Sequence, residues 1–347
     1  MYDIITIGTA TRDIFLTSPL FKVMKDKAHF REAGFPTGEA QCFALGGKIE
    51  ISKPIFATGG GATNAAVTFS RQGFKTAAMI KIGKDQAGKD ILEELKKEKI
   101  NILKLQTNAD TDYSTILLSP SGERTILVYR GASKSLSLDE IPFNKLKSKW
   151  VYIAPGKISF SVMEKIFDFF HKNGVLIAFN PSKRFIEKGL KQMSKLLNKS
   201  KVVFLNREEA AYLTKIDYNR EKEIFKVLDK EILGIVAMTD GENGVTVSDG
   251  RRIYKAKVFK EKKMVDRTGA GDAFGSGFVA GLLEKREKCE KNLCNSDNIE
   301  YAIRLGSANA TSVVEYVGAK IGILRKEDFK KNKRWNRLII KRTTANY

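Results

Sequence analysis

The residues of this sequence best suited to chemistry lie in one short segment, Asp266-Arg267-Thr268-Gly269-Ala270-Gly271-Asp272. Apolar residues then recur every four positions, as at Phe274 and Phe278, so we expect a helix to begin near Asp272. The first turn of a helix presents unpaired N–H groups and a partial positive charge, and the small residues Gly269-Ala270-Gly271 let an anion approach them closely. The segment therefore predicts a phosphate-binding turn, in which Asp272 is placed to orient a hydroxyl nucleophile.

Two other interpretations of this segment have to be weighed. Asp272 could simply cap a helix, as aspartate often does. However, Gly275, Gly277 and Gly281 inside the predicted helix each cost about 1 kcal/mol relative to alanine, which favours a backbone that must approach another surface closely. A dinucleotide-binding turn is disfavoured, because Phe274 stands where the GxGxxG pattern requires its third glycine.

The segment from Asp266 to Asp272 resembles the signature of the ribokinase-like, or PfkB-type, carbohydrate kinases, and further motifs of that family occur in the expected order over roughly residues 1–325. The resemblance implies a kinase that uses ATP to phosphorylate a hydroxyl of a sugar or nucleoside. It assigns catalysis to Asp272 and to the cradle Gly269-Ala270-Gly271. It also implies an α/β fold: a ribokinase-like three-layer sandwich with a mostly parallel central sheet and a small β-strand lid.

Two earlier segments supply the expected acceptor site. Residues 3–8 are a β-branched run that ends in glycine, which is typical of a buried parallel strand, and ligands of such sheets bind at the carboxyl ends of strands. The glycine-rich segment 58–64 then opens a helix, and residues 76–82 after it are expected to form a strand. Thr11 stands where ribokinase has an asparagine, which leaves the identity of the substrate open. The resemblance assigns substrate binding to Asp13, Thr11, Gly59, Gly60 and Asn64.

From Trp150 onward short apolar runs alternate with helical patterns, which predicts right-handed crossovers and a parallel sheet covered on both faces. The expected helices are near 160–172, 183–197, 207–214 and 220–231. Polar residues follow several of these runs. Asn206 and Glu209 form an NxxE pattern, which is common as a helix cap but by resemblance orders the water shell of Mg²⁺. The resemblance assigns ATP binding to Asn180, Asn206, Thr239, Gly241, Gly244, Ser307 and Asn309. It places a monovalent cation, K⁺, at Asp266, Thr268 and Gly318.

Alternating runs at 48–52, 114–118 and 125–129 indicate half-exposed strands that do not belong to the strand–helix alternation of the core. Residues 120–123 join the last two runs as a hairpin. By resemblance we assign them to the lid, which hydroxymethylpyrimidine and pyridoxal kinases of the same superfamily lack. Exposed lid strands would offer an edge for a homodimer.

The densest basic run, 325–342, is expected to form a terminal helix with a frayed end. The expected division is a core of 1–15, 59–108 and 131–330, a lid of 16–58 and 109–130, and a basic C-terminal tail of 331–347.

Composition bounds the remaining possibilities. The chain has 347 residues, 42% hydrophobic content and a net charge of +21, so it can bury a large core. We find no run of ~18 apolar residues and no signal-peptide pattern, and therefore expect no membrane span and a cytoplasmic location. Three cysteines without CxxC spacing fit free thiols, and two histidines argue against histidine-based metal or triad chemistry.

The high charge raises one alternative, a nucleic-acid-binding or regulatory protein on a kinase fold. Lysines are scattered along the chain with acidic residues interleaved, which favours a dispersed solvated surface and makes nucleic acid an unlikely partner. The positive field should nevertheless attract ATP.

Overall fold

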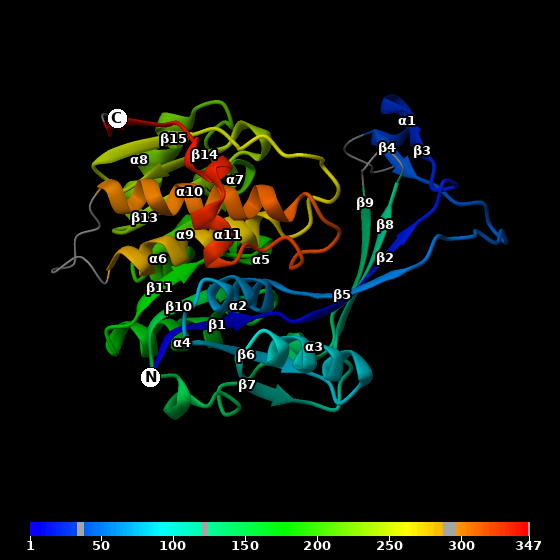
Figure 1. Cartoon of the computed structure of the whole chain (residues 1–347), viewed down its shortest axis with the longest axis horizontal. Coiled ribbons are helices and arrows are strands. Elements are labelled where there is room, and N and C mark those ends of the chain that lie inside the picture. The colour runs from blue at the N-terminus through cyan, green and yellow to red at the C-terminus, as the bar shows by residue number, and fades with distance from the viewer. Residues whose placement is uncertain (33–37, 120–123, 287–295, 346–347) are drawn as a thin grey trace.

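The computed structural model describes residues 1–32, 38–119, 124–286 and 296–345, and its core is a ten-stranded sheet (Figure 1). The strand order is β16-β15-β14-β13-β12-β11-β10-β1-β6-β7. Pairing is parallel from β7 to β13 and antiparallel from β13 to β16. The strands are β1 (Tyr2–Gly8), β6 (Thr76–Ile82), β7 (Asn101–Gln106), β10 (Ser148–Ala154), β11 (Leu176–Phe179), β12 (Val202–Asn206), β13 (Ile235–Thr239), β14 (Val245–Ser248), β15 (Arg252–Ala256) and β16 (Ile340–Thr344).

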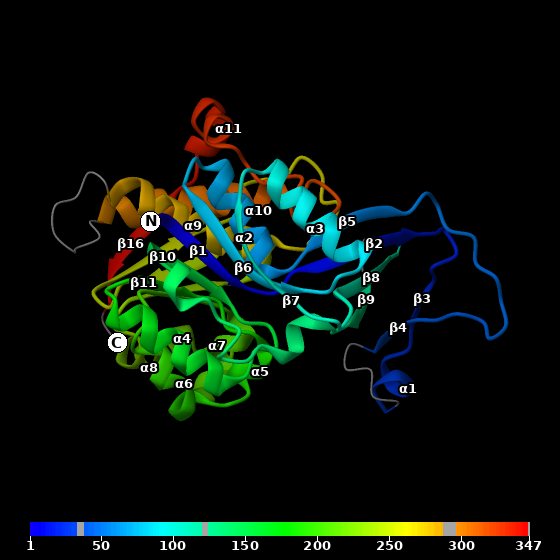
Figure 2. The ribbon, with the colours of Figure 1, turned by 90° about the horizontal axis from the view of Figure 1, so that it is seen from below.

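Helices cover both faces of this sheet, as the view in Figure 2 shows. One face carries α2 (Gly61–Arg71), α3 (Gln86–Lys97), α9 (Ala270–Arg286), α10 (Ser296–Val313) and α11 (Lys326–Lys331). The other carries α4 (Phe160–Lys172), α5 (Lys183–Ile186), α6 (Leu190–Leu197), α7 (Arg207–Thr214) and α8 (Glu221–Glu231). Short 3-10 turns are η1 (Ala132–Ser135), η2 (Phe143–Lys145), η3 (Gly241–Asn243) and η4 (Lys333–Asn336). The predicted three-layer α/β architecture is confirmed.

Alternate residues of the central strands feed two separate cores. Val151 and Ile153 of β10 face the cluster that includes Phe167 of α4, whereas Tyr152 faces the cluster that includes Phe278 of α9. Because both faces are covered, these strands are apolar at nearly every position, as expected for a parallel sheet. The single helix expected over 183–197 is instead divided into α5 and α6, because Gly189 between them has a φ of 76° that no helix allows.

A second sheet, with the order β5-β2-β8-β9, stands beside the core (Figure 1). Its strands are β5 (Ile55–Gly59), β2 (Thr11–Thr17), β8 (Asp112–Leu118) and β9 (Arg124–Tyr129). The predicted hairpin is confirmed in β8 and β9, while its turn at 120–123 lies outside the described residues. Because β2 already begins at Thr11, the second sheet takes in the end of the segment expected to belong to the core. Beyond it lie β3 (Val23–Lys25), α1 (Lys27–Glu32) and β4 (Glu39–Gln41).

Two expectations from the sequence need correction. The alternating run 48–52 is not a strand: most of its residues are exposed, so it lacks the buried face that alternation implies, and β5 begins only at Ile55. The last basic run is not one frayed helix. Its helix α11 ends at Lys331, and β16 then pairs with β15, which would otherwise be the open edge of the main sheet. Trp335, buried against Phe259 with ring centroids 5.1 Å apart, anchors this extension.

Within the described ranges, no helix is both long and apolar enough to cross a membrane. Of the three cysteines, Cys42 is exposed and free, and Cys289 and Cys294 lie outside the described residues.

Candidate active site

The predicted phosphate cradle forms the start of α9. Gly269 has a φ of 78°, a left-handed conformation that favours glycine, and its carbonyl accepts a hydrogen bond of 2.8 Å from the N–H of Ala273. A Cβ placed on Gly269 would lie only 2.4 Å from the Cβ of Ala319, so the cradle rests directly on the loop after α10. The first N–H groups of α9 have no carbonyl available within the helix. The N–H of Ala270 donates to the Arg267 carbonyl at 3.4 Å, which leaves the N–H groups of Gly271 and Asp272 to bind an anion beside the Asp272 carboxylate.

Three elements meet at the carboxylate of Asp272, which is half-buried in the first turn of α9. Asn64 of α2 donates from Nδ2 to Oδ2 at 2.9 Å, and Asn180, just after β11, donates to Oδ1 at 3.5 Å. A Cβ placed on Gly61 would lie 3.4 Å from Oδ1, so the glycine-rich segment also passes close to this group. The structure thus brings the acceptor, phosphate and catalytic predictions together at one point.

Burial raises the pKa of Asp272, and the hydrogen bond from Asn64 counteracts part of that rise. A carboxylate whose pKa is raised is a better general base than an exposed one. The hydroxyl of Tyr152, fully buried in β10, lies nearby: its own pKa is raised by burial and by the negative charge of Asp272. Sequence reasoning missed Tyr152, because an aromatic residue in a buried strand looks like ordinary core. The sequence signal that points to Tyr152 is Gly275, a glycine inside the helix: a Cβ there would lie 2.6 Å from the Tyr152 hydroxyl.

The predicted acceptor residues lie on the second sheet and next to it. Asp13 and Thr11 of β2 are buried, and the Thr11 hydroxyl donates to Asp13 Oδ1 at 2.9 Å. A Cβ placed on Gly59 would lie 2.1 Å from Asp13 Oδ2, so only glycine fits there. Gly59 lies against Asp13 and Gly61 lies near Asp272, so two residues of chain, about 7 Å, join the surroundings of the two carboxylates.

Burial also raises the pKa of Asp13. Hydrogen bonds from Thr11 and Ser114 and the positive charges of Lys320 and Arg130 act in the opposite direction. Ser114, Lys320 and Arg130 were not among the predicted substrate residues. Ser114 could have been found, because it is the register partner of Asp13 in the predicted strand β8. Thr9, whose hydroxyl accepts from the N–H of Gly61 at 3.1 Å, was also missed.

The predicted nucleotide residues gather at the carboxyl ends of adjacent strands. Asn206 and Thr239 are direct register partners in β12 and β13. The turn that follows contains Gly241 (φ 51°) and Gly244 (φ 100°), and is closed by a hydrogen bond of 2.9 Å from the N–H of Asp240 to the Gly244 carbonyl. Parallel strands end at one edge of a sheet, which is where open α/β sheets bind ligands.

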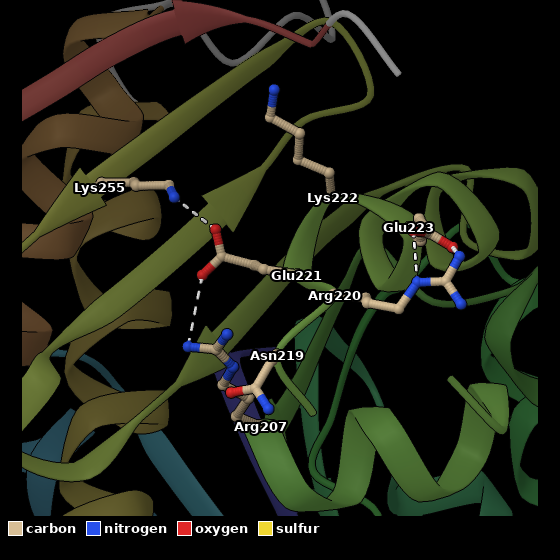
Figure 3. A pocket seen from close by; sticks show the side chains of 7 residues that line it. All are labelled: Arg207, Asn219, Arg220, Glu221, Lys222, Glu223 and Lys255. Carbon is tan, nitrogen blue, oxygen red and sulfur yellow. Dashed lines mark hydrogen bonds and ion pairs between the residues drawn. The ribbon is translucent and has the colours of Figure 1, made fainter. Parts of the chain in front are cut away.

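Arg207, a residue that sequence reasoning did not single out, holds this turn in place. Its guanidinium donates to Asp240 at 2.9 Å and packs over the Tyr218 ring at 4.6 Å. Behind it opens a surface pocket of about 530 Å³, where Glu221 pairs with both Arg207 and Lys255 (Figure 3). These charges pair with one another within the pocket.

The NxxE residues form a reciprocal cap on α7. The N–H of Glu209 donates to Asn206 Oδ1 at 2.7 Å, and the N–H of Asn206 donates to Glu209 Oε2 at 2.9 Å. Burial raises the pKa of Glu209. In the described part of the chain, no group of three or more His, Cys, Asp or Glu side chains could hold a metal. Mg²⁺ tolerates few protein ligands and keeps several waters, so one oriented carboxylate suits an ion held mainly by phosphate and water.

The structure brings the three predicted cation residues together. It places one predicted nucleotide residue, Asn309, in the packing between helices. Asp266 is buried; Thr268 donates to its Oδ1 and the N–H of Gly318 donates to its Oδ2. Ser307 is buried in α10. Asn309 is fully buried and bonded to Ala273, Thr68 and Leu324, so it holds α10 against its neighbours and does not face a ligand. The sequence placed it with Ser307 because both lie in a small-residue helix.

Comparison with known proteins defines the class of this site. Residues 39–326 match the model of the pfkB family carbohydrate kinases, and the chain belongs to this family. A sugar kinase of Archaeoglobus fulgidus is 29% identical over 268 residues, which cover 75% of this chain and 99% of that protein. Ribokinase of Haemophilus influenzae is 28% identical, covering 78% and 86%, and cytidine kinase of Thermococcus kodakarensis is 28% identical, covering 75% and 88%.

Solved structures agree on the fold. Ribokinase from Giardia lamblia superposes with a TM-score of 0.77 at 20% identity, covering 95% of this chain and 99% of that one. Ribokinase from Arabidopsis thaliana, in complex with ribose and ATP, gives 0.73 at 19% identity, covering 95% and 98%. The chain is therefore a sugar or nucleoside kinase of this family, a phosphotransferase that acts on a hydroxyl group. None of these matches supports the alternative of a nucleic-acid-binding or regulatory protein.

Proposed function

We propose that this kinase transfers the γ-phosphoryl group of ATP to a hydroxyl of a sugar or nucleoside, with Asp272 as the base. The observation that carries the proposal is the position of the Asp272 carboxylate, in the first turn of α9 beside the cradle and 2.9 Å from Asn64. The use of ATP is supported by the family and by the Arabidopsis ribokinase, which holds ribose and ATP together on the same fold.

In this mechanism Asp13 and Asn64 hold the acceptor so that one hydroxyl faces Asp272. The oxygen of that hydroxyl forms a bond to the γ-phosphorus while the bond between the β,γ-bridging oxygen and the γ-phosphorus breaks, and ADP leaves. Asp272 takes the proton, and in a loose transition state it does so late, so that positioning contributes more than base strength. The first N–H groups of α9 stabilise the charge on the transferring group.

Two metal ions are part of the proposal. Mg²⁺ would neutralise the charge of the phosphates, and Glu209, oriented by Asn206, would hold part of its water shell. A monovalent cation, K⁺, would lie beside the buried Asp266 and Thr268, close to Gly318. The remaining nucleotide contacts are assigned to Asn180, Thr239, Gly241, Gly244 and Ser307.

We further propose that residues 16–58 and 109–130 act as a lid that excludes water from the transferring phosphoryl group. The second sheet carries Asp13 and stands next to the core, which is the position such a lid requires.

The edge strand β9 of this sheet exposes apolar residues, with Leu127 57% and Tyr129 50% exposed. This edge is the proposed surface for a homodimer, and sedimentation of the chain tests it. The exposed free thiol of Cys42 favours the reducing cytoplasm.

Coupled ADP release, measured over a panel of sugars and nucleosides, tests the proposed function. The panel should include acidic acceptors, because Arg130 lies close enough to Asp13 for its charge to affect that carboxyl group. Phosphorylation of one class with saturation kinetics is the expected result. If no member of the panel stimulates ADP release above the rate measured without an acceptor, the proposal is wrong.

A further inference from the structure

The loop that follows α10, residues 314–325, contacts both parts of the proposed site. On one side Ala319 supports the cradle, since a Cβ on Gly269 would lie 2.4 Å from the Ala319 Cβ. On the other side Val317 packs against the small apolar cluster of the second sheet that contains Phe15. The same few residues therefore border the place of the phosphate and the sheet that carries Asp13.

Lys320, in the middle of this loop, is 4% exposed. Its ammonium donates to the hydroxyl of Thr58 at 2.5 Å and lies 3.7 Å from the carboxylate of Glu94 on α3. The Thr58 hydroxyl in turn donates to Glu94. Burial lowers the pKa of Lys320, and the negative charges of Glu94 and Asp13 act against that fall. A buried ammonium must be paired and hydrogen-bonded, so this chain of contacts strongly restrains the position of Thr58.

Thr58 lies on β5 at the point where that strand meets Asp13. Its neighbour Ala57 is the register partner of Asp13, and a Cβ on its other neighbour, Gly59, would lie 2.1 Å from the Asp13 carboxylate. Burial raises the pKa of Asp13, and the charge of Lys320 counteracts that rise. Lys320 thus acts on the acceptor site by position and by charge.

We propose that Lys320 is a positioning residue that couples the acceptor site to the phosphate cradle, by tying β5 and Asp13 to the loop on which Gly269 rests. The inference rests on the kinase activity proposed above. It predicts that a ligand bound at the cradle restrains β5 as well, and that this coupling needs the ammonium group of Lys320.

The loop itself has a second anchor that does not use this ammonium. Arg71 of α2 donates from Nη1 to the carbonyls of Lys320 at 2.9 Å and of Ile323 at 2.8 Å. Removing the Lys320 side-chain charge should therefore leave the loop and the cradle in place and release mainly β5. This separation makes the two sides of the site experimentally distinguishable.

The first test is Lys320→Met, which keeps most of the length and removes the charge. Lys81→Met is the matched control, because Lys81 is 7% exposed and paired with Glu140 at 2.7 Å, and neither residue is assigned to the site. For Lys320→Met we expect the KM of the acceptor to rise by ~10-fold or more while the KM of ATP changes by less than ~2-fold. Lys81→Met should lose comparable stability with both KM values unchanged. Equal effects of the two substitutions on the acceptor KM would overturn the inference.

A second test does not depend on knowing the acceptor. Amide hydrogen exchange of the full chain, with and without Mg·ADP, is followed at residues 55–59 and 268–273. We expect ADP to protect both segments in the wild type and in Lys81→Met, but only 268–273 in Lys320→Met. Protection of 55–59 that survives Lys320→Met refutes the coupling. A wild type that phosphorylates no acceptor refutes the proposed function instead, and the exchange comparison still decides whether Lys320 couples the two segments.

Discussion

Replacing Asp272 by asparagine should separate chemistry from binding. A positioned general base contributes about 10²- to 10⁴-fold to a rate. The asparagine oxygen can still accept the 2.9 Å bond from Asn64, and the contact that is lost is the longer one, 3.5 Å from Asn180. The acceptor and the cradle therefore stay in place, and we expect turnover to fall by about 10²- to 10³-fold, or ~3–4 kcal/mol of barrier, with ADP affinity unchanged.

The same variant makes a prediction about stability. Burial makes the pKa of Asp272 higher in the folded chain than in the unfolded one. An acid shifted in this direction destabilises the folded state at any pH above its folded pKa, and this cost disappears as the pH falls below its unfolded pKa. Near neutral pH, Asp272→Asn should therefore have a Tm equal to or above that of the wild type. Any gain should shrink as the pH is lowered.

Asp85→Asn is the matched control. Asp85 caps α3 and accepts hydrogen bonds from Gly88 at 2.8 Å and Thr111 at 2.7 Å. Burial would raise the pKa of Asp85, but the hydrogen bonds from Thr111 and Gly88 outweigh burial and lower it, so the ionised group stabilises the fold. This control should lower the Tm and leave turnover per folded molecule unchanged. Calorimetric ADP binding, thermal unfolding and coupled ADP release measure these effects. Near-normal turnover of Asp272→Asn would show that the assigned base is incorrect.

Three further predictions concern the surrounding residues. Glu209→Gln should raise the Mg²⁺ concentration needed for half-maximal rate, and an unchanged Mg²⁺ titration removes Glu209 from its assigned role. Gly59→Ala should raise the acceptor KM by ~10-fold or more, because its Cβ would lie 2.1 Å from Asp13 Oδ2; a normal KM would mean that Asp13 does not contact the acceptor. Asn64→Leu leaves the burial of Asp272 unchanged but removes the hydrogen bond that holds its pKa down, so the acid limb of the kcat profile should move to higher pH. A limb that stays in place or moves to lower pH contradicts this assignment.

Local patterns were enough to predict most of the core. The predicted helix over 160–172 is α4, and the run Thr76–Ile82 is β6. These elements are continuous and strongly periodic, so neighbouring residues specify them. Prediction failed where a partner distant in the chain decides the outcome. The run 48–52 alternates, but only Ser52 reaches the end of β2, with a hydrogen bond of 2.8 Å to the Thr17 carbonyl, and regular pairing with β2 begins at Ile55. The strand β16 forms because β15 presents an open edge.

The candidate site shows the same division. The cradle with Asp272 was readable because its small residues and charge lie within seven positions. Lys320 carries no such signal: its partners Thr58 and Glu94 are more than 200 positions away, and a lysine after Gly318-Ala319 looks like solvated surface. Asn309 was misplaced for the related reason that small-residue helices serve tight helix packing as well as ligands.

The sequence by itself determined the α/β class, the glycine-bearing turn that opens α9 and the residue types available for phosphoryl transfer, because each of these depends on residues close together in the chain. Only the tertiary structure decided which polar residues face one another. It set Asn64 and Asn180 against Asp272, turned Asn309 inward and buried Lys320 beneath β5. Burial and pairing fix the charge and position of such groups, and both are properties of the packed chain.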